Sequence, residues 1–150
     1  MRILVPDVDS VNSLPAVRYL VREFLGGDRF EVHLLFVRSR VRRAEAEQAL
    51  EPARALLAGC HIPHTVHVEA GDKARTIRAV ARRVDADRIV LGAARRWSAT
   101  RLGEDSVIQA LLEAAPVHVT LVSGNSVSRV ERYAVPAGLA GLAALLLTAE

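Results

Sequence analysis

The sequence predicts an α/β fold in which helices cover both faces of one open parallel sheet. Three observations lead to this prediction. Short apolar segments alternate with helical patterns along the first 123 residues. Some of these segments, residues 30–37 above all, are apolar on both faces, as the strands of a buried parallel sheet are. The length of 150 residues suits one domain with a substantial core.

Five strands and four helices are expected to alternate along the chain. The short apolar runs predict strands over residues 3–6, 30–37, 64–69, 88–91 and 117–122. Segments with an apolar residue at every third or fourth position, or rich in Ala, Glu and Arg, predict helices over residues 13–25, 41–58, 72–84 and 106–114.

Helix boundaries can be assigned from capping and breaking residues. Ser13 is a suitable N-cap for the first helix, and Gly26-Gly27 ends it. Pro52 interrupts the second helical segment and is expected to kink or restart the helix. Asp72 is expected to cap the third helix, because its side chain can accept from a free backbone N–H.

Right-handed crossovers between such strands place the switch point of the sheet, where the strand order reverses, beside the first and fourth strands. Ligands of such sheets bind outside the carboxyl ends of the strands at this switch point. In this chain that place corresponds to residues 6–10 and to the loop of residues 92–106.

A strand that ends at Gly92 is followed by a polar loop and then by Ser106 at a helix start. Glycine lets the backbone approach a ligand, and a helix N-terminus offers N–H groups to phosphate. This arrangement resembles the universal stress protein family, whose ATP-binding loop reads G-x2-G-x9-G-[ST]. Gly92 and Ser106 match its first and last positions, whereas Arg95 and Asp105 replace both inner glycines.

The resemblance covers about residues 1–123. Together with the alternation of strands and helices, it implies the sheet order 3-2-1-4-5. It also implies further positions around an adenine nucleotide. Pro6 falls on the proline that follows the family's first strand, but Val8 falls on the Asp that contacts the nucleoside. Asp7 is adjacent, although a strand turns consecutive side chains to opposite sides. Val37 matches a position where the second strand touches adenine. The predicted cofactor-binding residues are therefore Pro6, Asp7, Val37, Gly92, Arg95, Ser106 and Val107.

Two functions remain open from the sequence. The favoured one is a dimeric stress-response or regulatory module whose degenerate ATP motif binds ATP weakly or not at all. Side chains at the two inner glycine positions fill space that phosphates would occupy, and the carboxylate of Asp105 would repel them. The alternative is a stress protein that binds ATP or AMP through residues 92–107, with Arg95 as a cation for phosphate. Neither function requires catalysis, and we expect no enzyme activity, no resident cofactor and no metal.

Composition argues against a nucleic-acid-binding protein. The isoelectric point is about 9.7, but the chain has 20 basic and 17 acidic residues, so the net charge is only +3. The basic residues are spread over several helices rather than concentrated in a recognisable module. The single cysteine, Cys60, excludes an internal disulfide, and no secretory signal is apparent, so a cytoplasmic location is expected.

The chain is expected to divide into an α/β domain over residues 1–123 and a tail over residues 124–150. Residues 123–128 look like a linker, and residues 134–149 carry no charge. We favour a terminal helix that packs on its own or a partner subunit over one that associates with a membrane. The fifth strand has no proline or formal charge and is expected at the sheet edge, which favours a homodimer paired through it.

Overall fold

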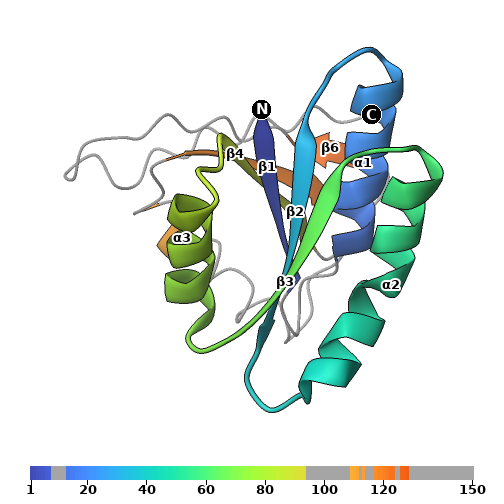
Figure 1. The fold of residues 1–150 in the computed structure, drawn as a ribbon. Helices are drawn as coiled ribbons and strands as arrows, with labels where there is room; N and C mark the ends of the chain where they lie inside the picture. The colour runs from blue at the N-terminus through green and yellow to red at the C-terminus, as the bar shows by residue number, and fades with distance from the viewer. Residues whose placement is uncertain (8–12, 94–108, 112, 114–116, 124–125, 129–150) are drawn as a thin grey trace.

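The computed structural model describes residues 1–7, 13–93, 109–111, 113, 117–123 and 126–128 (Figure 1). Its strands are β1 (Arg2–Asp7), β2 (Glu31–Arg38), β3 (His64–Ala70), β4 (Arg88–Ala93), β5 (His118–Ser123) and β6 (Ser126–Ser128). Its helices are α1 (Ser13–Leu25), α2 (Arg43–Gly59) and α3 (Lys73–Arg83). Residues 109–111 and 113 are also helical, as expected for the helix before β5.

The sheet order is β3-β2-β1-β4-β5-β6, and the first five strands in this order are parallel. This confirms the predicted order 3-2-1-4-5. β1 pairs with β2 along its whole length, from Arg2 opposite Glu31 to Asp7 opposite Phe36. Its ladder with β4 consists of two pairs, Ile3 with Arg88 and Leu4 with Ile89. β1 therefore lies between β2 and β4, at the switch point where the strand order reverses.

One part of the expected tail belongs to the sheet instead. Ser126–Ser128, assigned from sequence to a linker, forms β6 and pairs antiparallel with β5, with Leu121 opposite Ser128 and Ser123 opposite Ser126. The expectation of a linker here is wrong for these three residues. The physical reason is that a chain reversing directly after β5 can satisfy backbone groups of an otherwise open edge.

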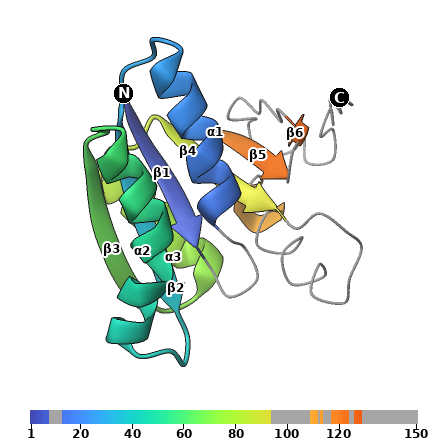
Figure 2. The ribbon, with the colours of Figure 1, turned by 90° about the vertical axis from the view of Figure 1, so that its right-hand side faces the viewer.

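Helices cover both faces of the sheet, with α1 and α2 on one side and α3 on the other (Figures 1 and 2). Alternate strand residues consequently enter two separate cores. The core under α1 and α2 contains Ile3, Val5, Val32, Leu34, Phe36, Val90 and Val122. The core under α3 contains Leu4, Leu35, Val37, Ile89, Leu91, Leu111 and Val119.

The expected helix ends are largely confirmed. α1 ends at Leu25 before Gly26, and the Asp72 side chain accepts a hydrogen bond from the backbone N–H of Arg75 at 3.0 Å. The helix does not restart at Pro52, because α2 continues through it to Gly59. The buried residues Leu50, Ala53 and Leu57 anchor the helix on both sides of the proline and offset its missing hydrogen bond.

Candidate functional site

Four of the seven predicted cofactor-binding residues lie at the carboxyl ends of three neighbouring strands. Pro6 and Asp7 end β1, Val37 lies near the end of β2, and Gly92 lies near the end of β4. Pro6 is opposite Leu35 of β2, and Asp7 is opposite Phe36. The fold thus brings these four positions to one edge of the sheet, as predicted. Arg95, Ser106 and Val107 lie outside the described residues.

The side chain of Asp7 serves the start of α1. Its Oδ2 atom accepts hydrogen bonds from the Ser13 hydroxyl at 2.8 Å and from the Ser13 backbone N–H at 3.2 Å. Both interactions satisfy groups at a helix N-terminus, where negative charge is favourable. Asp7 has the same strand parity as Ile3 and Val5, which belong to the core under α1 and α2. The Asp7 carboxylate therefore lies on the α1 side of the sheet.

The other described positions offer backbone rather than side chains to a ligand. Val37 is 1% exposed and packs in the core under α3. Pro6 and Gly92 are also buried, and Gly92 pairs with Val122 of β5. Contacts from these strand ends to a bound molecule would come mainly from carbonyl and N–H groups at the ends of β2 and β4.

A buried polar cluster under α1 was not predicted from the sequence. Arg88, the first residue of β4, forms an ion pair with Glu23 at 3.1 Å and donates to Thr120 Oγ1 and to the Tyr19 hydroxyl, each at 2.9 Å. The Tyr19 hydroxyl also donates to Glu23. Burial and then the contact with Glu23 raise the pKa of Tyr19. Burial alone would lower the pKa of Arg88, but Tyr19 and Glu23 outweigh it and the pKa is raised.

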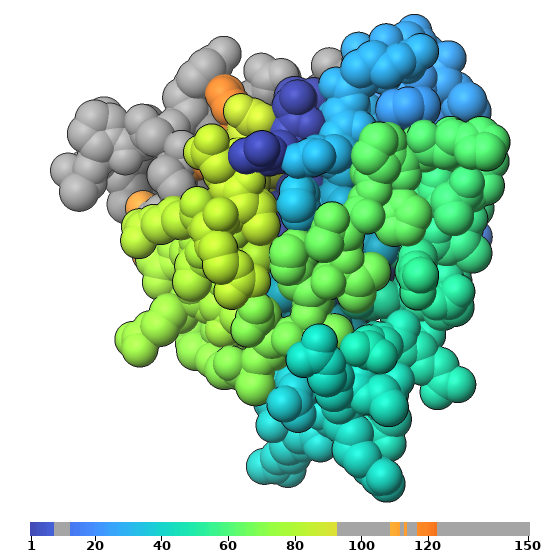
Figure 3. Space-filling view, viewed as in Figure 1, coloured from blue at the N-terminus to red at the C-terminus, as the bar shows by residue number. Residues whose placement is uncertain are grey.

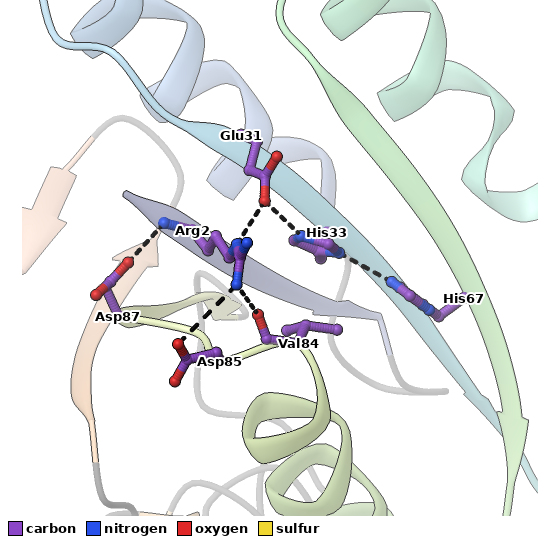
Figure 4. A network of polar contacts seen from close by, with 7 residues as sticks. All are labelled: Arg2, Glu31, His33, His67, Val84, Asp85 and Asp87. Atoms are coloured by element: carbon purple, nitrogen blue, oxygen red, sulfur yellow. Dashed lines mark hydrogen bonds and ion pairs between the residues drawn. The ribbon is translucent and has the colours of Figure 1, made fainter.

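A second network, shown in Figure 4, joins β1, β2, β3 and the turn that follows α3. Arg2 Nε donates to Glu31 at 2.8 Å, and the Arg2 backbone N–H donates to Asp87 at 2.7 Å. Glu31 also contacts His33 Nε2 at 3.3 Å. His33 Nδ1 lies 3.0 Å from His67 Nε2. Hydrogen bonds from His33 and then Arg2 lower the pKa of Glu31.

The described residues also form a groove of about 560 Å³ between α2 and β3. Val66, Val68 and Leu50 line it together with charged residues of α2, including Arg43, Glu47, Glu51 and Arg54. Figure 3 shows that α2, β3 and α3 form much of this face of the molecule. None of the predicted cofactor-binding residues lines the groove, so it is separate from the carboxyl edge of the sheet.

Within the part of the chain that the structure describes, no three His, Cys, Asp or Glu side chains are placed to share a metal ion. The same residues include no helix with the length and apolar character that crossing a membrane requires.

The model of the universal stress protein family matches residues 37–123. This region runs from the end of β2 to the end of β5 and includes Gly92, Arg95 and Ser106. No curated protein matches the sequence.

Solved structures with the same fold are distant in sequence. A universal stress protein in complex with cAMP is 16% identical with a TM-score of 0.66, covering 82% of this chain and 96% of that one. An Arabidopsis thaliana member with AMP bound is 15% identical with a TM-score of 0.64, covering 83% and 92%. An Archaeoglobus fulgidus member in complex with dAMP is 23% identical with a TM-score of 0.62, covering 81% and 97%.

Proposed function

Because the chain belongs to the universal stress protein family, we propose that it acts as a dimeric stress-response or regulatory module that has lost strong ATP binding. The module would work through contacts with partner proteins rather than through catalysis. The chain shares its fold with relatives that hold cAMP, AMP and dAMP. The carboxyl edge of the sheet is part of this fold. The side chains supplied to this edge differ from the family pattern.

The observation that carries the proposal is the position of Asp7. Its carboxylate accepts both hydrogen bonds from Ser13 and points to the α1 side of the sheet. A carboxylate that contacted a nucleoside would be expected one residue later, where the sequence has Val8. Among the described residues at the end of β1, no carboxylate therefore replaces the family's nucleoside contact. The loss of a hydrogen-bonded contact to a polar ligand group weakens binding by about 1 kcal/mol.

The loop sequence supports the same proposal. Arg95 and Asp105 stand where the family motif has glycines. A side chain at such a position prevents the close backbone approach that glycine allows. A carboxylate near phosphate oxygens adds repulsion between like charges. Together with the change at the end of β1, three positions depart from the pattern associated with ATP binding.

The alternative is binding of AMP or another adenine nucleotide at the same edge. It is supported by the relatives that hold cAMP, AMP and dAMP in this fold. Gly92 and Ser106 are retained, and Arg95 would place a cation in the loop that could pair with a single phosphate. The lost glycines would weaken the binding of a nucleoside monophosphate less than that of ATP, because the monophosphate carries fewer phosphates.

Calorimetric titration of the full chain with ATP and with AMP, each with and without Mg²⁺, tests the proposal. We expect no saturable binding of ATP at micromolar concentration. Saturable ATP binding that disappears in the variant Gly92→Val, Ser106→Ala would contradict the proposal. Binding of AMP alone, abolished by Arg95→Ala, would instead establish the alternative.

Dimer formation is the second element of the proposal. The outer edge of the sheet next to Leu121, Val122 and Ser123 is β6, so a second copy would meet β6 there rather than β5. A three-residue strand covers only part of an edge. Pairing with a second copy would satisfy the backbone groups that remain.

A further inference from the structure

The contact between His33 and His67 joins the edge strand β3 to β2, its one neighbour in the sheet. The two residues lie diagonally across the ladder, since His67 is opposite Leu35 and His33 is opposite Thr65. Their rings are stacked, with centroids 5.2 Å apart and an angle of 23° between the ring planes. The His33 side chain is 13% exposed, so water has little access to it.

The partner on the other side of His33 determines where the protons lie. The pKa of Glu31 is lowered, so its carboxylate is ionised at neutral pH and can only accept. The Nε2 atom of His33 must therefore carry the hydrogen that it shares with Glu31. In neutral His33 this leaves Nδ1 as an acceptor, and the Nε2–H of His67 donates to it at 3.0 Å.

The His33–His67 pair can bind one added proton while His33 keeps its contacts with both Glu31 and His67. Solvent protonates His67 at Nδ1, and the hydrogen between the rings moves from His67 Nε2 to His33 Nδ1. The charge then resides on His33, between the carboxylate of Glu31 and a neutral His67 that accepts through Nε2. A second proton leaves an N–H on each of the facing nitrogens and no acceptor between them.

The surrounding charges make the second proton costly. Arg83 of α3 faces His67, while Glu69 of β3 offsets it in part and is itself paired with Arg83 at 2.6 Å. The guanidinium of Arg2 on β1 pairs with Glu31 and lies 4.0 Å from Asp85, and the Arg2 backbone N–H donates to Asp87 (Figure 4). Burial, then His33 and Arg83, lower the pKa of His67.

We propose that the His33–His67 pair is an acid-sensitive latch that holds the edge strand β3 on β2, remaining closed with one added proton and opening with the second. Opening exposes the β2 edge of the sheet and the apolar side chains of Val66 and Val68, which are half-buried in the closed state. The latch would make the exposure of this edge depend on pH. It involves none of the residues assigned to the nucleotide site.

The sign of the pH effect follows from the lowered pKa of His67. Above pH of about 6.5, the ring is neutral whether β3 is closed or open, and the latch is fully stable. As the pH falls, the open state takes up a proton that the closed state resists. Each pH unit then favours opening by about tenfold, until the closed state is protonated as well.

Histidine NMR and backbone hydrogen exchange of the full chain, measured between pH 7.5 and 4.5, test the latch. The Cε1–H signals of His33 and His67 are expected to change together at each protonation step, because the two rings share one hydrogen. Protection factors of the β3 amides should fall by about tenfold per pH unit from a pH of about 6.5 down to the second step, while those of β1 stay constant. Two rings that titrate independently, with β3 protection unaffected by pH, would overturn the proposal.

Two variants separate the latch from general acid sensitivity. In His67→Gln, the side-chain amide can still donate to His33 Nδ1 but cannot be protonated, so β3 protection should no longer depend on pH. His64→Gln is the matched control, because His64 also lies on β3 but its ring contacts the backbone carbonyl of Ile62. It should keep both titration steps. An acid-dependent loss of β3 protection that persists in His67→Gln would contradict the proposal, and the wild-type titration decides independently if that variant does not fold.

Discussion

Replacement of Arg88 by Met is expected to destabilise the fold strongly, because it removes the centre of the buried cluster under α1. The side chain of Arg88 is 18% exposed and that of its partner Glu23 is 16% exposed. If one charge is removed, water therefore solvates the remaining charge only weakly. The guanidinium also donates to Tyr19 and Thr120. Methionine retains the apolar part of the side chain and its packing. The variant therefore isolates the loss of the charge and its hydrogen bonds.

We expect a loss of about 3 kcal/mol in the free energy of unfolding, the lower end of what removing one partner of a buried ion pair costs. The lower end applies because both side chains keep some contact with water. With a urea m-value of about 2 kcal/mol per M, the unfolding midpoint should fall by about 1.5 M. Far-ultraviolet circular dichroism during urea titration measures this shift.

Arg43→Met is the matched control. Arg43 forms an ion pair with Glu47 at 3.2 Å, one helical turn away, and both side chains are more than half exposed. Its removal should cost about 0.5 kcal/mol or less. If Arg88→Met shifts the midpoint no more than this control does, the cluster contributes little and the reasoning from burial is refuted.

Two further predictions concern the fold, and a third concerns the proposed dimer. Gly71→Ala should cost about 1–3 kcal/mol in urea unfolding, because Gly71 has φ +141° and an added Cβ would lie 3.0 Å from Thr76 Oγ1; Gly59→Ala, in open space, should be close to neutral. Asp72→Ala should cost about 1 kcal/mol through the lost cap at Arg75, and Asp72→Asn should recover most of it. Light scattering should give twice the 16.3 kDa monomer mass, and a stable monomer at high micromolar concentration would rule out the proposed dimer.

The fold was largely predictable because it depends on local patterns. The both-face apolar run of β2 and the cap at Asp72 can be recognised without knowledge of distant residues. β6 could not be recognised, because Ser126–Ser128 has no apolar periodicity and exists only as a pairing with β5. The continuity of α2 through Pro52 likewise depends on buried contacts that outweigh the local preference of proline.

The positions of the candidate residues in the fold could be predicted, but the contacts of their side chains could not. Topology alone put Pro6, Asp7 and Gly92 at neighbouring strand ends. The hydrogen bond between Asp7 and Ser13 could be recognised only from the structure. Strand parity nevertheless indicated the side of the sheet to which the Asp7 side chain points. The Arg88 cluster left no sequence signal, since its partners lie 32 to 69 positions away. The His33–His67 contact joins two strands in the same way.

The most direct test of the central claim restores the family pattern in this chain. The variant Val8→Asp, Arg95→Gly, Asp105→Gly should regain the nucleoside carboxylate and both inner glycines of the loop, and its ATP binding can be compared with that of the natural sequence by calorimetry with Mg²⁺. If the three substitutions are the reason for weak binding, the restored variant should bind ATP with micromolar affinity while the natural sequence shows no saturable heat. Equal binding by the two proteins, or no binding by a restored variant that folds, would contradict the account.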